Sequence, residues 1–311
     1  MSHKIDDLLE AVLESYSLHP HIGKIGETQF PKRERILEAL KKLQYVIFPG
    51  FFDQKELRSD NIRFYTGQLL EEIRETLLEQ VAKTLHLFKE EYRQATDEEV
   101  QKRSEEIVEA FLGAIPKIRE YLATDIEAAY EGDPAAFSRD EVISSYPGIY
   151  ATMVNRIAHE LYELGVPLIP RVMTEHAHSV TGIDIHPGAK LGRYFFIDHG
   201  TGIVIGETAE IGEHAKIYQG VTLGALSTRG GQQLKGQKRH PTVEDDVTIY
   251  SGASILGGET VIGGGVVIGG NAFVTKSVPE QTRVSAKMPE LQFKRNENVE
   301  FQNGEFLTYE I

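Results

Sequence analysis

Apolar side chains follow two different periods along this chain, and the change falls near residue 170. In residues 1–170 they recur every three to four positions, the spacing of one face of an amphipathic helix. The clearest stripe consists of Leu70, Ile73, Leu77, Val81, Leu85 and Phe88. Comparable stripes predict helices over residues 107–129, with a kink or a fresh start at Pro116, and over residues 149–164. One or two further helices are expected within residues 1–65.

From residue 185 onward an aliphatic side chain returns every six positions. These positions are Ile185, Leu191, Ile197, Ile205, Ile211, Ile217, Leu223, Val243, Ile249, Ile255, Ile262, Ile268 and Val274. Glycine often follows them, and alanine or valine often comes four residues later. A period of six fits neither a helix nor a plain strand, but it fits a short strand and a turn repeated in a parallel β-helix. A Gly- and Val-rich sandwich is the alternative, although a sandwich does not keep a six-residue register.

The two periods predict an α+β fold in three segments. Residues 1–170 form an N-terminal all-helical domain, residues 171–289 a parallel β-helix, and residues 290–311 a charged C-terminal tail. The six-residue repeat breaks at the polar segment 225–240, which predicts an extruded loop. This loop has four basic side chains, Arg229, Lys235, Lys238 and Arg239. Long loops that leave a compact coil are usually functional or disordered, and the basic side chains suggest that this one meets an anion.

Composition argues against several classes of function. The formal net charge is −14, which disfavours a nucleic-acid partner because phosphate contacts need clustered Lys and Arg. The sequence contains no cysteine and therefore no disulfide or thiol nucleophile, which fits a reducing compartment. The first residues lack the basic start and apolar core of a signal peptide, and no stretch approaches the ~20 apolar residues of a membrane span. We expect a cytoplasmic protein with no membrane partner.

Histidine is the side chain best suited to moving a proton near neutral pH, and one histidine of the coil stands out. His199 directly follows an apolar position of the repeat and Asp198, and Gly200 and Gly202 leave room for a ligand beside it. Asp184 lies fifteen residues earlier, close to one turn of a three-sided coil, so that it could stack near His199. A carboxylate that orients an imidazole makes a general base. A satisfied turn histidine is the alternative from spacing alone.

Other chemistries find less support in the sequence. A zinc site would need clustered histidines on the coil strands, whereas the pair His176 and His178 lies before the repeat begins. The serines Ser227, Ser251 and Ser254 lie in no nucleophile elbow, which disfavours a hydrolase. No Gly-Lys-Ser or Gly-Lys-Thr phosphate loop occurs. We therefore assign no metal-binding residue.

Three segments carry motifs of a known family. Residues 184–192 read DIHPGAKLG, residues 198–209 read DHGTGIVIGETA, and RHP follows the loop at 239–241. Over residues 125–279 the chain resembles the serine O-acetyltransferases of the hexapeptide-repeat acyltransferase superfamily. The resemblance implies a left-handed β-helix, homotrimers or dimers of trimers, and a site formed between chains.

The resemblance also implies an activity, the transfer of the acetyl group of acetyl-CoA to the hydroxyl of L-serine, which is the first step of cysteine biosynthesis. His199 matches the general base that removes the hydroxyl proton, and Asp184 matches the carboxylate that orients it. His240 matches a residue near the developing oxyanion. No metal is required for this reaction.

Residues that would bind the two substrates follow from the same resemblance. Asp133 and Asp198 match the acids that hold the ammonium group of serine, and Arg239 matches the cation that pairs with its carboxylate. From the residues alone, Asp133 could equally be a cap or turn aspartate and Arg239 a solvated loop side chain. Acetyl-CoA is expected in a groove between neighbouring coils, where the matching small residues are Ala225, Ser251 and Gly270. These three could also be tight-corner residues, and Ala225 replaces a usual glycine.

Two other readings of function stay open at this point. One is an acetyltransferase for a different acceptor, such as a sugar, an amino sugar or homoserine, and the other is a non-catalytic scaffold. The chain ends in Ile311, and the resemblance implies a partner, O-acetylserine sulfhydrylase, whose active site a terminal isoleucine can enter.

Overall fold

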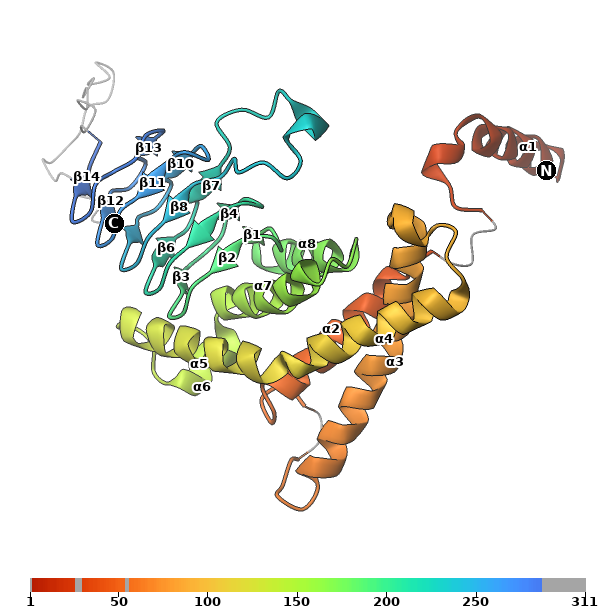
Figure 1. Cartoon of the computed structure of the whole chain (residues 1–311), viewed down its shortest axis with the longest axis horizontal. Helices are drawn as coiled ribbons and strands as arrows, with labels where there is room; N and C mark the ends of the chain where they lie inside the picture. The colour runs from red at the N-terminus through yellow and green to blue at the C-terminus, as the bar shows by residue number, and fades with distance from the viewer. Residues whose placement is uncertain (1, 26–29, 54–55, 287–311) are drawn as a thin grey trace, which may run out of the picture.

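The computed structural model describes residues 2–25, 30–53 and 56–286. The expected tail, residues 290–311, lies outside this part of the chain. Helices occupy the N-terminal half and short parallel strands the C-terminal half (Figure 1). Within the described residues, no helix is long and apolar enough to span a membrane.

The N-terminal half is helical, as the apolar stripes predict, and its helices continue past the expected boundary at residue 170. The helices are α1 Ser2–Leu18, α2 Arg33–Ile47, α3 Ile62–Phe88, α4 Asp97–Gly113, α5 Ile115–Gly132, α6 Arg139–Ser145, α7 Pro147–Glu163 and α8 Ile169–Thr181. The stripe at 70–88 lies in α3, and Pro116 marks a fresh start because it falls in the first turn of α5. Helix α8 crosses the boundary expected at residue 170. Pro170 lies in its first turn, where the missing N–H of proline costs nothing, and it therefore begins a helix here.

One apolar core joins most of these helices. Leu40 of α2, Leu77 of α3, Phe111 of α4 and Ile157 of α7 are buried together in it. Helices α7 and α8 lie against each other and against the first strands of the coil. This packing fixes the helical half on one end of the β-helix (Figure 1).

The C-terminal half is a three-sided parallel β-helix of about five turns, consistent with the left-handed form that the family resemblance implies. Its strands are β1 Asp184–Ile185, β2 Lys190–Leu191, β3 Phe196–Asp198, β4 Val204–Ile205, β5 Glu210–Ile211, β6 Lys216–Tyr218, β7 Thr222–Gly224, β8 Thr242–Val243, β9 Thr248–Ile249, β10 Ser254–Leu256, β11 Val261–Ile262, β12 Val267–Ile268, β13 Phe273–Val274 and β14 Arg283–Val284. They form three sheets, in the orders β1-β4-β7-β10-β13, β11-β8-β5-β2 and β14-β12-β9-β6-β3.

The six-residue positions stack along the axis of the coil. Ile205 pairs with Leu223 and Leu223 with Ile255, and none of the three is more than 1% exposed. Each coil thus buries its aliphatic side chain against that of the neighbouring coil. A single repeat could not bury this side chain without a neighbour. The predicted parallel β-helix is confirmed.

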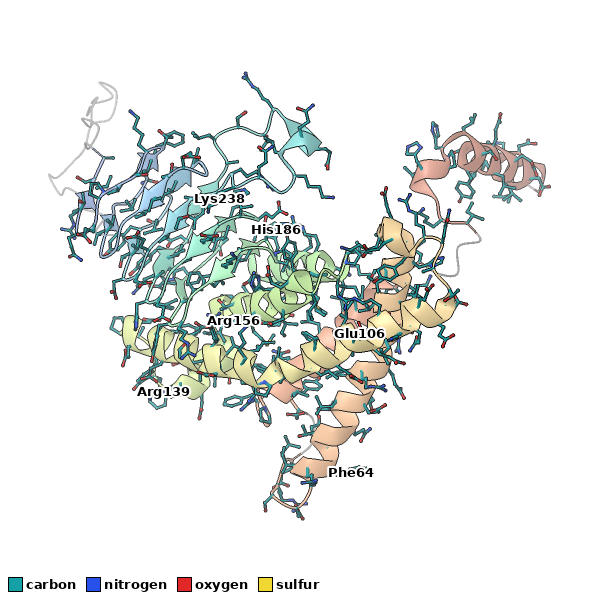
Figure 2. All side chains as sticks on the ribbon, viewed as in Figure 1. Phe64, Glu106, Arg139, Arg156, His186 and Lys238 are labelled. Carbon is teal, nitrogen blue, oxygen red and sulfur yellow. The ribbon has the colours of Figure 1, made fainter. Side chains whose placement is uncertain are left out.

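The extruded loop is also confirmed, between β7 and β8, and it contains a short 3-10 helix, η3 Gly231–Leu234. Figure 2 shows Lys238 at the base of this loop. Its Nζ donates to the carbonyl oxygens of Thr208, at 2.6 Å, and Pro241, at 3.3 Å. These bonds fasten the returning end of the loop to the coil directly before Arg239.

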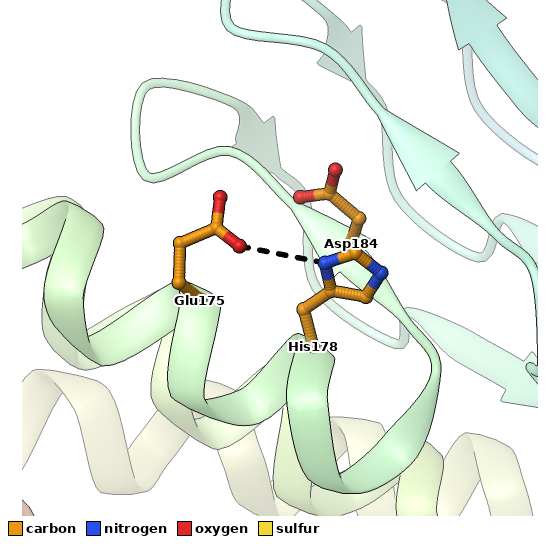
Figure 3. A group of neighbouring side chains, drawn as sticks. All are labelled: Glu175, His178 and Asp184. Carbon is orange, nitrogen blue, oxygen red and sulfur yellow. Dashed lines mark ion pairs between the residues drawn. The ribbon is translucent and has the colours of Figure 1, made fainter.

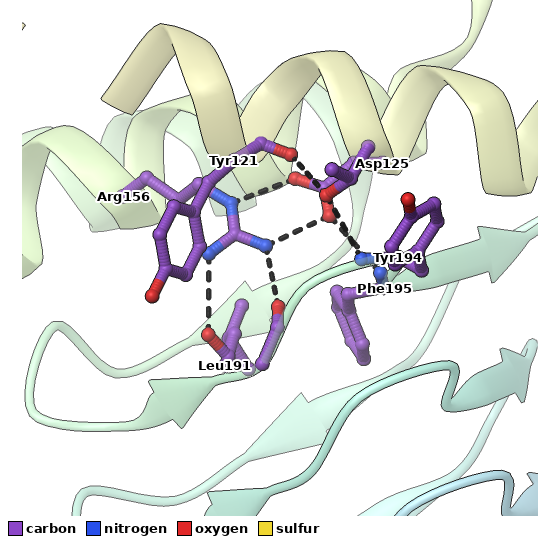
Figure 4. A network of polar contacts seen from close by, with 8 residues as sticks. Tyr121, Asp125, Arg156, Leu191, Tyr194 and Phe195 are labelled. Atoms are coloured by element: carbon purple, nitrogen blue, oxygen red, sulfur yellow. Dashed lines mark hydrogen bonds and ion pairs between the residues drawn. The ribbon is translucent and has the colours of Figure 1, made fainter. Parts of the chain in front are cut away.

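A buried ion pair fastens the helical half to the coil (Figure 4). Arg156 of α7 donates through Nε and Nη2 to both oxygens of Asp125 of α5, at 2.7 and 2.8 Å. It also donates to the carbonyl oxygens of Leu191, at 3.2 Å, and Gly192, at 2.7 Å. Asp125 in turn accepts from the backbone N–H of Phe195 at 3.0 Å. Because nearly every polar atom of the pair is satisfied, the network holds α5 against the segment that leads into β3.

Candidate active site

His199 lies at the corner that follows β3. Its backbone has a φ of 59°, an uncommon conformation for a residue other than glycine, and its side chain is 71% exposed. Six other non-glycine residues of the described chain also have positive φ, and five of them lie at corners of the coil, so this conformation is common to such corners. What distinguishes His199 is therefore its surroundings.

Two carboxylates and a lysine lie around that corner, on segments far apart in the sequence. Nε2 of His199 lies 3.8 Å from Oδ1 of Asp198, and Nζ of Lys216 lies 3.9 Å from Oδ2 of the same carboxylate. Lys216 also donates to the carbonyl oxygen of Gly132, at 2.6 Å, which places the end of α5 and Asp133 beside the coil. We call Asp133, Asp198, His199 and Lys216 the acidic corner.

Asp133 is held as a carboxylate. It accepts from the Tyr146 hydroxyl at 2.5 Å and from the Ala135 backbone N–H at 2.8 Å. These two bonds, with a smaller effect of the positive charge of Lys216, lower the pKa of Asp133 below its usual value. Burial and the neighbouring carboxylate raise the pKa of Tyr146 to about 12, so its hydroxyl stays a donor. The corner therefore presents ionised oxygens suited to a cationic group.

Asp184 does not contact His199. Among the described residues, no hydrogen bond or ion pair joins the two side chains. Asp184 begins β1, where its partner in the sheet is Val204, and its carboxylate lies beside Glu175 and His178 of α8 (Figure 3). The expected near-eighteen-residue turn is lengthened here by the two extra residues between Ile197 and Ile205, which shift the register between coils.

A second cluster lies where the loop returns to the coil. Nδ1 of His240 accepts from the Thr208 backbone N–H at 3.0 Å, and the Thr208 hydroxyl lies 2.9 Å away. Burial, together with the charge of Arg239, lowers the pKa of His240 to about 4. At neutral pH the ring is thus uncharged, and because Nδ1 accepts, its proton is assigned to Nε2. A neutral imidazole with a donating Nε2–H can stabilise an oxyanion.

Gly206 allows this ring to pack directly on the backbone. A Cβ at Gly206 would lie 2.0 Å from Cδ2 of His240, closer than any real contact. No larger residue fits unless the ring moves.

Arg239 pairs with Glu207, whose other oxygen accepts from the Tyr162 hydroxyl of α7 at 2.9 Å. Although burial raises it, the pKa of Glu207 is lowered overall by the hydrogen bonds from Arg239 and Tyr162. The Nη1 atom of Arg239 is buried and has no hydrogen-bond partner among the described residues. A buried guanidinium donor without a partner costs free energy, and an anionic ligand would satisfy it. We call Glu207, Arg239 and His240 the basic corner.

The two corners lie at opposite ends of strand β4, on the two sides of its sheet where the coil turns. The acidic corner precedes β4 and the basic corner follows it, so residues 203–206 separate them by three steps of ~3.3 Å, or about 10 Å. The ammonium and carboxylate groups of an α-amino acid share one carbon atom. One such molecule is therefore short compared with the distance between the two corners of a single chain.

The residues expected to bind acetyl-CoA are divided between the same two edges. Ser251 and Gly270 lie on successive coils, where a Cβ at Gly270 would be 3.2 Å from the Ser251 carbonyl oxygen. Ala225 follows β7 at the opposite edge of the sheet, where the extruded loop begins. The structure brings Ser251 and Gly270 together but not Ala225.

Sequence reasoning missed the partners that hold these side chains. Lys216, Tyr146 and Tyr162 contact the site from other segments, and no local motif marks them. Glu207 and Thr208 lie within segment 198–209, and the family motif in that segment could have pointed to them.

Comparisons with known proteins agree with this architecture. The curated serine acetyltransferase (plasmid) of Synechococcus elongatus is 44% identical over 248 residues, which cover 77% of this chain and 78% of that protein. The crystal structure of serine acetyltransferase isoform 3 from Entamoeba histolytica in complex with cysteine has a TM-score of 0.70 at 37% identity, over 95% of this chain and 97% of that one. Serine acetyltransferase 1 of the same organism, in complex with L-cysteine, has a TM-score of 0.67 at 39% identity, over 82% and 87%. No family model matches the chain.

The three-sided parallel β-helix and its structural neighbours place the chain in the hexapeptide-repeat class. The identity and coverage of the relatives then specify the branch. The chain belongs to the serine acetyltransferase family.

Proposed function

We propose that this chain transfers the acetyl group of acetyl-CoA to the hydroxyl of L-serine, giving O-acetyl-L-serine and CoA in the first step of cysteine biosynthesis. The observation that carries the proposal is the complementarity of the two corners to a zwitterion. One offers two carboxylates, and the other offers a buried guanidinium donor without a partner. Membership of the family supports the same acceptor and donor.

In this reaction His199 acts as the general base. It takes the proton of the serine hydroxyl as the oxygen attacks the thioester carbon, and the proton then passes to the departing thiolate of CoA. The Nε2–H of neutral His240 donates to the oxygen of the tetrahedral intermediate. Asp184 orients the imidazole. For this contact the exposed ring of His199 must turn away from Asp198 and towards β1.

The substrate is held at both ends. Asp133 and Asp198 accept from the ammonium group, and Lys216 keeps the two acids from repelling each other while the site is empty. Arg239 binds the carboxylate of serine through Nη1. Part of its contact with Glu207 is then replaced by the contact with the substrate.

Because the corners are at opposite edges of a sheet, we propose a site between neighbouring chains of a homotrimer, which could pair as a dimer of trimers. The pantetheine of acetyl-CoA lies along the same interface, near Ala225, Ser251 and Gly270. No step is assigned to a metal ion. The expected contact of Ile311 with O-acetylserine sulfhydrylase falls outside the described residues and stays a prediction, as does a cytoplasmic location.

The test is the consumption of acetyl-CoA, followed by loss of thioester absorbance, with and without L-serine. Homoserine, an amino sugar and a sugar serve as alternative acceptors under the same conditions. Consumption that depends on L-serine, with mass-spectrometric detection of O-acetyl-L-serine, supports the proposal. Faster turnover of another acceptor contradicts the assigned substrate, and no turnover of any acceptor points to a scaffold.

A further inference from the structure

Three side chains that can bind a metal ion converge outside the two corners. Glu175 and His178 lie one turn apart on the same face of α8, and Asp184 lies at the start of β1 (Figure 3). One ligand atom of each lies within 4.8 Å of those of the other two. We call these residues the α8 triad.

The turn between α8 and β1 creates this arrangement. Gly182 adopts a left-handed φ of 71° and its N–H donates to the His178 carbonyl at 2.8 Å, so that the helix stops and the chain reverses. Two residues later, Asp184 therefore faces the last turns of the helix that precedes it. The cluster follows from a closed backbone turn and does not depend on a long mobile segment.

The donor set fits Zn²⁺ and similar ions. One imidazole and two carboxylates, with water in the remaining position, are ligands of zinc, whereas Mg²⁺ and Ca²⁺ prefer oxygen alone. Zinc ligands at ~2.0–2.2 Å in a tetrahedron lie about 3.3–3.6 Å from one another. Since the ligand atoms lie within 4.8 Å of one another, no pair of them must close by more than about 1.5 Å to reach this spacing. The side chains of His178 and Glu175 are 44% and 47% exposed, which leaves them room to do so.

The ion pairs that Glu175 and His178 make in the structure leave ligand atoms of both side chains able to bind a cation. Arg171 pairs with Oε1 of Glu175, whereas Nδ1 of His178 lies 3.5 Å from Oε2. A metal ion bound by Oε2 and by the imidazole would replace only the second, weaker contact. Arg171 could keep its ion pair, so the two cations do not exclude each other.

We propose that the α8 triad binds Zn²⁺ and that the bound ion inhibits acetyl transfer by withdrawing Asp184 from His199. The inhibitory half rests on the proposed function, in which Asp184 orients the general base. A carboxylate oxygen bound to a metal ion cannot also hold the imidazole in place. The corner that contains His199 is close, since the Gly202 N–H donates to the Gly182 carbonyl at 2.8 Å.

Binding and inhibition are measured separately on the full-length protein. Calorimetric titration with Zn²⁺ and the visible absorption of added Co²⁺ report the metal site without any need for turnover. Activity is followed through the thioester, because Zn²⁺ also binds the thiol of released CoA. The test variant is Glu175→Gln/His178→Ala, and the matched control is His176→Ala, which removes a histidine of α8 outside the triad. Mg²⁺ is the control ion.

We expect the wild type and His176→Ala to bind about one Zn²⁺ that the double variant does not bind, and to lose ~10-fold or more of their turnover when Zn²⁺ saturates. The double variant should keep its basal turnover and resist Zn²⁺, and a chelator should restore the wild type. Equal binding by all three proteins refutes the site. Triad-dependent binding without inhibition refutes the inhibitory role and removes Asp184 from the mechanism. Absence of serine-dependent turnover refutes the proposed function while the Co²⁺ spectrum still reports on the site.

Discussion

Replacing Arg239 tests the binding of the substrate carboxylate most sharply. In the structure its guanidinium has two distinct parts: Nη2 pairs with Glu207, and the buried Nη1 has no partner within the described part of the chain. Arg239→Ala removes both, whereas Arg239→Lys keeps a positive charge but loses the planar fork. Arg229→Ala, which removes an exposed arginine of the same loop, is the matched control.

The size of the effect follows from the contact that is lost. A hydrogen bond to a charged group contributes about 1.5–3 kcal/mol, which corresponds to about 10- to 150-fold in binding. We therefore expect Arg239→Ala to raise KM for L-serine by about 10- to 150-fold and KM for acetyl-CoA much less. Arg239→Lys should lie between the wild type and the alanine variant. Glu207→Gln combined with Arg239→Ala controls for the carboxylate that the single variant leaves without its cation.

Steady-state kinetics with each substrate varied in turn measures the two KM values, and circular dichroism confirms that the variants are folded. Equal effects on both KM values would contradict the assigned role of Arg239. So would an Arg229→Ala variant that loses as much affinity for serine, because its side chain lies outside the basic corner.

Three further predictions follow from the same geometry. His199→Ala should lower kcat by ~10²–10⁴-fold with little change in thermal stability, and near-normal turnover would exclude it as the base. Gly206→Ala should lower kcat because its Cβ displaces the His240 ring, whereas Gly67→Ala, which meets nothing within 4 Å, should not; equal activities would contradict the packing. The free energy of unfolding should fall as the pH drops from 6.5 towards 4, because burial lowers the pKa of His186 and His240 to about 4 in the folded state and the unfolded chain binds protons first. Urea unfolding at several pH values measures this, and a stability that rises over that interval would refute it.

Much of the fold could be predicted because the repeat is local. An aliphatic side chain at every sixth position can be buried only by the next coil, so the period itself specifies the stacking of Ile205 on Leu223. Helix α8 could not be predicted in the same way. A proline followed by few apolar positions favours a break, and only packing against α7 and β1 shows that Pro170 begins a helix.

In the site, too, the residues of local motifs could be predicted and their distant partners could not. His199, Asp198, Arg239 and His240 lie in short motifs and could be singled out from the sequence. Their partners could not, since Tyr162 reaches Glu207 across 45 positions and Lys216 reaches Gly132 across 84. The expected contact between Asp184 and His199 is absent in a single chain, because spacing along a coil does not specify which way an exposed side chain turns.

In the proposed trimer, one active site combines the acidic corner of one chain with the basic corner of another. Mixing the His199→Ala and Arg239→Ala variants, unfolding them together and refolding them tests it directly. At an L-serine concentration below the wild-type KM, where each variant alone is nearly inactive, random trimers should recover about one quarter of wild-type turnover, because one interface in four then pairs an intact His199 with an intact Arg239. Turnover no greater than the sum of the separate variants would contradict a site shared between two chains.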